Sequence, residues 1–250
     1  MGTLETPLRR LLPEPGTTTV GEIVAGFDPA AAAPADRPYL YTNFALTIDG
    51  HATIEGRSGA IGSDADTAML VGLRMRADAV MIGAGTLRAE GYGQIIRDPE
   101  KQAQRERDGL SPEPLMVLVS ERLAIPWTAP LFTEGAGRVM IFTAAADEPP
   151  TTTTPVDVVR HPDGVDLAAA LHTLRAEHGV RALLCEGGPT LHGSLLAAGL
   201  VDELFVTRAP RLAGGAGPGL VVDLEADVRD LELVSLCESG GELYARYRVS

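Results

Sequence analysis

Two glycine-rich turns are the segments of this sequence best suited to chemistry. The first spans residues 83–86 after an apolar run at residues 79–82, and the second spans residues 186–190 after a similar run at residues 182–185. Glycine lets the backbone approach a phosphate closely, and the free amides at the start of a following helix attract an anion. Two such turns predict a ligand with several phosphates, although a single one is as easily explained by tight geometry alone.

Neither turn carries the signature of a common nucleotide-binding or hydrolase motif. Arg88 occupies the third glycine position of a Rossmann fingerprint, and no Walker lysine or Gly-x-Ser-x-Gly elbow occurs. The histidines lack metal-ligand spacing, so we expect no metal; they are His51, His161, His172, His178 and His192.

Four charged side chains have positions that suit a polar ligand, each beside a simpler interpretation. Glu186 ends an apolar strand at a glycine turn, where a carboxylate faces solvent or binds the donors of a ligand. Arg74 lies two residues from Arg76 on a predicted helix, so one of the two can face a ligand. Arg97 lies in a polar loop and Asp49 in an Asp-Gly turn, where solvation or a plain turn also explains them.

The elements that must position these residues have the pattern of a three-layer α/β domain. Ser63 offers an N-cap, with Asp66 in the first turn of the helix that follows. Glycine turns join the last two strands as a hairpin, which predicts an antiparallel carboxyl-terminal edge. We predict strands at residues 39–48, 79–82, 115–119, 139–143, 182–185, 204–206, 231–237 and 243–249, helices at 63–76, 167–178 and from 189 to about 198, and loops at 91–114 and 144–155.

The chain of 250 residues is predicted to form a single domain over residues 38–250. Residues 1–37 are rich in proline and alanine, with a helical pattern only at residues 20–27, and are predicted to form a wrapping arm.

Composition narrows the partners and the location. The formal net charge is −13 without a basic run, so nucleic acid and anionic membranes are poor partners. No apolar stretch is long enough to span a membrane, and the amino end lacks a signal-sequence pattern. Cys185 and Cys237 are too few for a disulfide framework, so we expect reduced thiols and a cytoplasmic protein.

Taken together, several motifs resemble the pyrimidine reductase family, the reductase half of bifunctional riboflavin-biosynthesis proteins. They are NFALTIDG at residues 43–50, LRMRADAVMIGAGT at 73–86, EGGPTL at 186–191 and GLVDE at 199–203. The resemblance implies a dihydrofolate-reductase-like three-layer sandwich with a mixed, mostly parallel central sheet and an antiparallel carboxyl-terminal hairpin. The His-x-Glu and Cys-x-x-Cys motifs of the family's zinc deaminase half are missing, which indicates a stand-alone reductase.

The resemblance also implies NADPH as cofactor and a set of binding residues. Ser58, Arg74, Arg97 and Glu186 match positions that hold the substrate, with Arg97 on its 5′-phosphate and Glu186 on the pyrimidine donors. Asp49 and Glu186 are the predicted catalytic residues, and the proton donor is unassigned. The implied cofactor contacts are Leu46, Thr47, Gly83, Gly85, Thr86, Ser120, Gly187, Gly188, Pro189, Thr190 and Leu191, with Ser120 and the nearby Arg122 at the 2′-phosphate.

One segment departs from the family. Residues 89–93 read Ala-Glu-Gly-Tyr-Gly where fused members often carry Asp-Asp-Pro, which affects the contacts around Arg97.

The resulting hypothesis is an NADPH-dependent reductase that converts 5-amino-6-(5-phosphoribosylamino)uracil to the ribityl product in riboflavin biosynthesis. We expect it to form a homodimer through its carboxyl-terminal hairpin. Reduction of dihydrofolate or another pterin on the same fold is an alternative, as is a non-catalytic nucleotide-binding protein. A phosphorylated substrate requires an anion clamp such as Arg97, whereas dihydrofolate does not.

Overall fold

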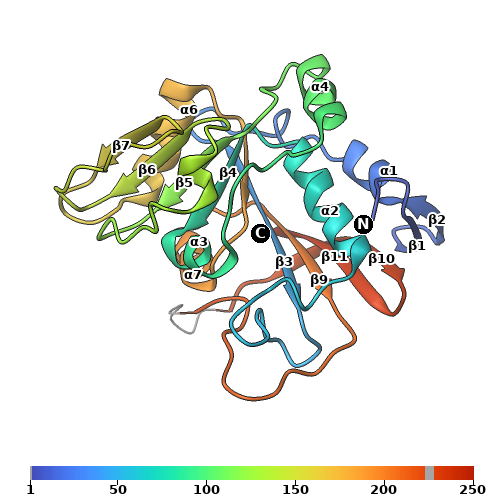
Figure 1. Ribbon diagram of the computed structural model, residues 1–250. Coiled ribbons are helices and arrows are strands. Elements are labelled where there is room, and N and C mark those ends of the chain that lie inside the picture. The colour runs from blue at the N-terminus through green and yellow to red at the C-terminus, as the bar shows by residue number, and fades with distance from the viewer. Residues whose placement is uncertain (1, 223–227) are drawn as a thin grey trace.

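One mixed sheet runs through the molecule in the computed structural model, which describes residues 2–222 and 228–250 (Figure 1). Within this part of the chain the sheet has 11 strands in the order β2-β1-β10-β11-β9-β3-β8-β4-β5-β6-β7. The strands are β1 (Pro7–Leu12), β2 (Gly16–Thr19), β3 (Tyr39–Leu46), β4 (Ala79–Gly83), β5 (Leu115–Val119), β6 (Val139–Thr143), β7 (Val156–Arg160), β8 (Ala182–Cys185), β9 (Glu203–Arg208), β10 (Leu231–Ser239) and β11 (Glu242–Val249).

The sheet is parallel in its centre and antiparallel toward one end, as the sequence predicted. β3 pairs in parallel with β8 and β9, and β4 pairs in parallel with β8 and β5. β11 pairs antiparallel with β9 and β10, so the predicted carboxyl-terminal hairpin is confirmed. The carboxyl ends of β3, β4 and β8 therefore meet at one edge of the sheet, where ligands of such folds bind.

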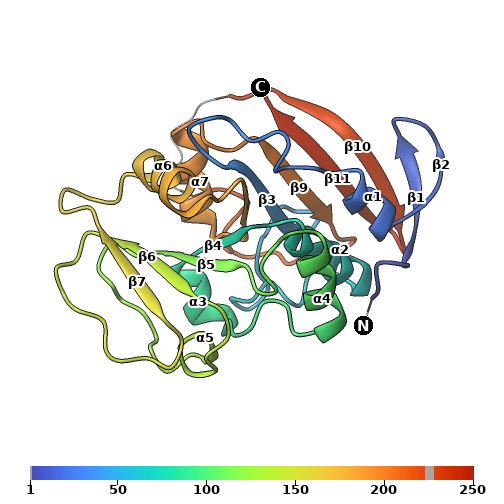
Figure 2. The ribbon, with the colours of Figure 1, turned by 90° about the horizontal axis from the view of Figure 1, so that it is seen from above.

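Helices cover both faces of the sheet, and the layered arrangement is visible from above (Figure 2). On one side α1 (Val20–Ala25), α2 (Asp64–Met75) and α3 (Ala84–Glu90) contribute to one apolar core, and on the other side α6 (Leu167–His178) and α7 (Pro189–Ala197) contribute to a second. In β4, Val80 and Ile82 enter the first core while Ala79 and Met81 enter the second, which is the alternation expected of a strand buried on both faces. The three-layer prediction is confirmed.

Local capping explains where two of the predicted helices begin and end. The Ser63 hydroxyl accepts the amide of Ala65 at 3.1 Å at the start of α2. The Asp166 carboxylate accepts the amide of Ala169 at 3.0 Å, and α6 stops at Gly179, whose φ of 67° is the left-handed conformation that glycine adopts readily.

Several elements were not predicted. α4 (Pro99–Arg107) occupies the predicted loop at 91–114; its sequence PEKQAQRER has no apolar stripe because the buried side chain in it is Arg105. β7 follows the predicted loop at 144–155 as an edge strand, and α5 (Pro130–Thr133) is a single turn. None of the helices among the described residues is long and apolar enough to cross a membrane.

The amino-terminal segment forms two strands of the sheet, β1 and β2, in addition to the helix whose pattern the sequence showed. β2 pairs with β1, and β1 pairs antiparallel with β10, with Arg9 opposite Glu238. This pairing joins positions 229 residues apart, so no local pattern in the threonine- and proline-rich segment signals it. The division into an arm and a reductase domain stays a prediction.

Candidate active site

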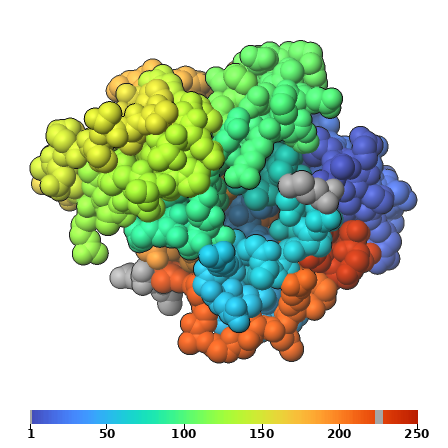
Figure 3. All heavy atoms as spheres, in the orientation of Figure 1, coloured from blue at the N-terminus to red at the C-terminus, as the bar shows by residue number. Residues whose placement is uncertain are grey.

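A cleft of about 400 Å³ lies at the carboxyl ends of β3, β4 and β8. In the space-filling view it appears as the hollow in the middle of the molecule's face (Figure 3). Its lining combines the end of β3, one face of α2 and both glycine turns: Asn43, Phe44 and Ala45, then Asp66, Thr67 and Leu70, then Gly83, Gly85, Thr86, Gly188, Pro189, Thr190 and Leu191. The structure thus brings the two glycine turns, about 100 residues apart in sequence, to one wall.

The second glycine turn has no room for side chains. Gly187 has a φ of 100°, and a Cβ there would lie 3.2 Å from the ring of Phe44. A Cβ on Gly188 would lie 2.8 Å from the Thr86 hydroxyl of the other turn. The amide of Gly83 donates to the carbonyl of Gly187 at 2.8 Å, so the turns are also hydrogen-bonded to each other. Glycine at these positions allows a ligand to approach the backbone closely.

The start of α7 faces the same cleft with free amides. Gly188 is its N-cap and provides no side-chain hydrogen bond, and Pro189 has no N–H. The amides of Thr190 and Leu191 belong to the first turn, where a helix offers no internal acceptor. A helix start without a side-chain cap, beside a hydroxyl from Thr86, fits the phosphates of a dinucleotide.

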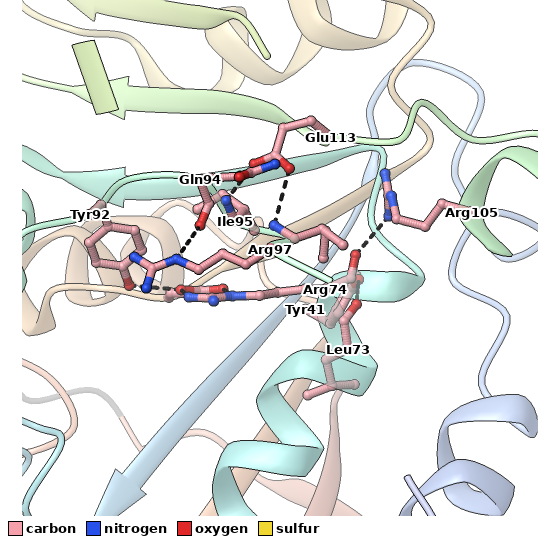
Figure 4. Close-up of polar contacts among 11 residues, drawn as sticks. Tyr41, Leu73, Arg74, Tyr92, Gln94, Ile95, Arg97, Arg105 and Glu113 are labelled. Carbon is pink, nitrogen blue, oxygen red and sulfur yellow. Dashed lines mark hydrogen bonds and ion pairs between the residues drawn. The ribbon is translucent and has the colours of Figure 1, made fainter. Parts of the chain in front are cut away.

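Glu186, Arg74 and Tyr92 form a buried polar cluster at the edge of the cleft, and Figure 4 shows Arg74 and Tyr92 of this cluster. Arg74 donates from Nε and from one terminal nitrogen to the two carboxylate oxygens of Glu186, both at 2.6 Å, and the Tyr92 hydroxyl donates to Glu186 Oε2 at 2.7 Å. The side chain of Glu186 is 3% exposed and that of Arg74 is 16% exposed. Burial and the charge of Glu186 raise the pKa of Tyr92 well above its usual value, so it remains a donor. Both oxygens of Glu186 therefore have partners in the protein itself.

The last turn of α2, which carries Arg74, is held by two buried donors. Arg105 is fully buried and donates to the carbonyls of Arg74 at 2.8 Å and Met75 at 3.2 Å, and the Tyr41 hydroxyl donates to the carbonyl of Leu73 at 2.9 Å (Figure 4). The carbonyls of Leu73 and Arg74 also accept the backbone amides of Arg76 and Ala77, at 3.1 and 3.2 Å, so the two side chains add to the backbone cap at the end of α2. Burial lowers the pKa of the Arg105 guanidinium.

A second cavity of about 590 Å³ adjoins the cleft and contains Arg97 and Lys101. Ser58, Thr67 and Tyr92 line both spaces. The Nε of Arg97 is 3.4 Å from the carbonyl of Gln94, and its terminal nitrogens have no hydrogen-bond partner within residues 2–222 and 228–250. Arg97 is thus an exposed cation in a cavity that shares a wall with the cleft, which suits an anionic group of the ligand.

The segment before Arg97 is fixed by one carboxylate. Glu113 accepts the amides of Ile95 and Ile96, the latter at 3.1 Å (Figure 4). Burial raises the pKa of Glu113, and these backbone donors oppose that rise. Arg97 is therefore presented from an anchored backbone rather than from a free loop.

The segment that departs from the family supplies partners for two predicted substrate residues. Glu90 Oε1 accepts both the amide and the hydroxyl of Ser58, at 2.8 and 2.9 Å, and Tyr92 contacts Glu186 as described above. Glu90 and Tyr92 were not predicted as site residues, and their place in the motif-breaking segment was the available signal.

Other predicted residues do not line the cleft. Asp49 accepts the Thr47 hydroxyl at 2.5 Å and the amides of Ala213 and Gly214 at 3.2 and 2.8 Å. These hydrogen bonds lower the pKa of Asp49. Through them the carboxylate anchors the loop at residues 213–214. Leu46 and Thr47 are buried, and it is Phe44 and Ala45 that line the cleft. The catalytic role of Asp49 and the cofactor contacts of Leu46 and Thr47 stay predictions.

Ser120 follows β5 and is buried, with its amide donating to the carbonyl of Phe142 at 3.0 Å. It lies outside the lining of the cleft, and Arg122 beside it is exposed. The assignment of these two residues to a 2′-phosphate stays a prediction.

Two cleft residues with unused polar atoms were missed by the sequence reasoning. Oδ1 of Asn43 and Oδ1 of Asp66 are buried and have no hydrogen-bond partner in the described part of the chain. Burial and the charge of Glu242 raise the pKa of Asp66 to about 6, and a hydrogen bond with Thr207 opposes that rise. In the sequence Asp66 reads simply as an acidic residue in the first turn of a helix.

Comparison with known proteins identifies related chains over nearly this whole length. Residues 38–244 match the RibD C-terminal domain family. The 2,5-diamino-6-ribosylamino-4(3H)-pyrimidinone 5′-phosphate reductase of Archaeoglobus fulgidus is 32% identical over 213 residues, which cover 84% of this chain and 96% of that protein. The reductase of the same name from Methanothermobacter thermautotrophicus is 31% identical, covering 85% of this chain and 99% of that protein.

A solved structure agrees with this match. The crystal structure of a pyrimidine reductase-like protein from Corynebacterium diphtheriae superposes with a TM-score of 0.78 at 26% identity, covering 93% of this chain and 99% of that one.

Proposed function

This chain belongs to the RibD C-terminal domain family of riboflavin-biosynthesis pyrimidine reductases, and we propose that it uses NADPH to reduce a ribosylaminopyrimidine 5′-phosphate to its ribityl product. The observation that carries the proposal is the wall that two spaces share: Ser58, Thr67 and Tyr92 line both the cleft walled by the glycine turns and the cavity that contains Arg97. One space suits a dinucleotide and the other suits the phosphate of a second ligand.

Bound NADPH supplies a hydride. The glycines of the two turns and the free amides of Thr190 and Leu191 would hold its phosphates, and the Thr86 hydroxyl faces the same space. Ser120 and Arg122 would discriminate NADPH from NADH at the 2′-phosphate. The protein's contribution to such a step is binding, orientation and electrostatics.

The substrate would lie along α2, with its phosphate at Arg97 and Lys101. Reduction adds a hydride to the ribose C1′ of the ring-opened imine and a proton to the adjacent nitrogen, while NADPH becomes NADP⁺. Glu186, paired with Arg74 and Tyr92, forms a rigid polar wall beside the substrate rather than a mobile acid or base.

Two pyrimidine rings are compatible with this reaction. The sequence prediction gives the uracil ring of 5-amino-6-(5-phosphoribosylamino)uracil, and the names of the archaeal relatives give the 2,5-diamino-4(3H)-pyrimidinone ring. The ribose chemistry is the same for both, so either ring satisfies the proposed function.

The test is the decay of NADPH absorbance when the purified protein receives each of the two phosphorylated pyrimidines or, separately, dihydrofolate. We expect turnover with a phosphorylated pyrimidine, and Arg97→Ala should raise its KM by about tenfold or more because a charge-assisted phosphate contact is lost. Arg107→Ala is the matched control, since Arg107 is exposed on α4 and bonds only to Gln104 among the described residues.

Other outcomes would revise the proposal. Turnover of dihydrofolate alone, unaffected by Arg97→Ala, would move the protein to pterin reduction, and no decay with any substrate would favour a nucleotide-binding protein without turnover.

A further inference from the structure

The cleft contains a buried carboxylate that the proposed reaction has not yet used. Asp66 lines the cleft from the first turn of α2, and its Oδ1 is buried without a hydrogen-bond partner within the described residues. The Oδ1 of Asn43, a residue of β3 that lines the same cleft, is also buried without a hydrogen-bond partner among the described residues. Buried acceptors without donors are unfavourable and rare, so a pair of them in one cleft indicates a ligand that brings donors.

The other two carboxylates that line the cleft are already engaged. Glu186 accepts from Arg74 with both oxygens and from Tyr92, and Glu90 accepts both donors of Ser58. Asp66 has a hydrogen bond with Thr207, but its Oδ1 has no partner among the described residues and is left to receive a hydrogen bond from a ligand.

The surroundings of Asp66 form a built site. A Cβ on Gly62 would lie 2.1 Å from Asp66 Oδ2, so glycine at this position leaves the room that the carboxylate occupies. Behind it, buried Glu242 of β11 accepts the Ser63 hydroxyl at 2.6 Å and also the Tyr244 hydroxyl. These donors are directed at Glu242, whose charge acts on Asp66, and the hydrogen bond with Thr207 is the contact that opposes this charge at Asp66.

The distance along α2 matches an extended substrate. Asp66, Leu70 and Arg74 are four residues apart and share one face of the helix. A rise of 1.5 Å per residue places Asp66 about 12 Å from Arg74 along the axis. Arg74 lines the cavity of Arg97, so a ligand whose phosphate lies in that cavity directs its opposite end, the pyrimidine ring, toward Asp66.

We propose that Asp66, with Asn43 in the lining of the same cleft, binds the 2-amino group and the adjacent ring N–H of a 2-amino-4-oxopyrimidine, so that the 2,5-diamino ring is preferred over the uracil ring. The proposal rests on the proposed function. A carboxylate accepts two adjacent donors in parallel, and the 2-amino-4(3H)-pyrimidinone edge offers them at C2 and N3. Uracil carries an oxygen at C2, which would face the carboxylate as acceptor against acceptor.

The experiment compares kcat/KM for the two phosphorylated pyrimidines in the wild type, in Asp66→Asn and in the control Asp64→Asn. The wild type should prefer the 2,5-diamino ring by about tenfold or more. An asparagine amide offers one acceptor and one donor in place of two acceptors, which matches N3–H and the C2 oxygen of uracil. Asp66→Asn should therefore reverse the preference, whereas Asp64→Asn removes a charge from the same helical turn at an exposed position and should leave it unchanged.

The ratio between the two rings separates recognition from stability, because a damaged fold lowers both activities together. An unchanged ratio in Asp66→Asn, or a wild type that prefers uracil, would overturn the inference while leaving the reductase function intact.

If no pyrimidine is reduced, the proposed function fails and ring binding decides the inference separately. Calorimetric titration with free 2-amino-4-hydroxypyrimidine and with uracil should then show tighter binding of the former, reversed in Asp66→Asn; equal binding of the two rings would overturn it. Turnover of dihydrofolate that requires Asp66 but not Arg97 would support the ring contact with a pterin as its source.

Discussion

Replacing Glu186 with glutamine should lower both the stability of the protein and its NADPH oxidation, because the carboxylate neutralises a buried arginine. In the wild type it accepts two hydrogen bonds from Arg74 at 2.6 Å and one from Tyr92 at 2.7 Å. A glutamine side chain keeps the size but offers one oxygen and no charge. Arg74, with 16% of its side chain exposed, would then be a buried cation without a counter-ion.

The size of the effect follows from breaking a buried ion pair at one partner, which costs about 3–5 kcal/mol. For a chain of this length, that corresponds to a fall in Tm on the order of 10 °C. Tyr92→Phe removes one hydrogen bond to a charged acceptor and leaves the ion pair, so it should cost about 1.5–3 kcal/mol.

Urea denaturation followed by circular dichroism measures both changes. Glu203→Gln is the matched control, because Glu203 is buried and makes a similar two-bond pair with Arg246, at 2.9 and 2.8 Å, outside the cleft. Both glutamine variants should lose similar stability, but only Glu186→Gln should lose NADPH oxidation beyond what its unfolded fraction explains. A loss of stability below about 1 kcal/mol for Glu186→Gln would refute the reasoning, since the Arg74–Glu186 pair would then contribute no more than an exposed, solvent-screened ion pair.

Three further predictions use other parts of the molecule. The pKa of Asp66 is about 6 in the folded protein and 3.8 ordinarily, so between these values the native state retains a proton that the unfolded state has lost. The free energy of unfolding should therefore fall by up to about 3 kcal/mol between pH 4 and pH 6 because of this site. Urea denaturation of Asp66→Asn should lack this pH-dependent fall. Light scattering should give a homodimer through the carboxyl-terminal hairpin, where Leu233 and Leu243 are 38% and 37% exposed; replacing both with glutamate should give a monomer, and a monomeric wild type would contradict the prediction. Arg122→Ala should reduce the preference for NADPH over NADH, and an unchanged ratio of the two kcat/KM values would remove Arg122 from the 2′-phosphate site.

The glycine turns and most of the sheet were predictable because their signals are local. Residues 115–119, 139–143, 167–178 and 182–185 have the predicted elements with the predicted bounds, since each is a short apolar or amphipathic run between clear stop signals. α4 and β1 were not, because the buried face of α4 is an arginine and β1 depends on pairing with β10.

By itself, the sequence therefore determined the strand–turn–helix units and the types of residue at their ends, because backbone propensity, capping and glycine geometry act over a few neighbours. The tertiary structure decided which of those residues meet. Arg74 and Glu186 are 112 positions apart and are joined by packing of α2 against β8, and among the described residues Oδ1 of Asp66 is left in the cleft without a partner. Such pairings depend on the burial of each side chain and on which donors lie within hydrogen-bond distance of each oxygen. Both are decided only when the whole sheet and its helices have assembled.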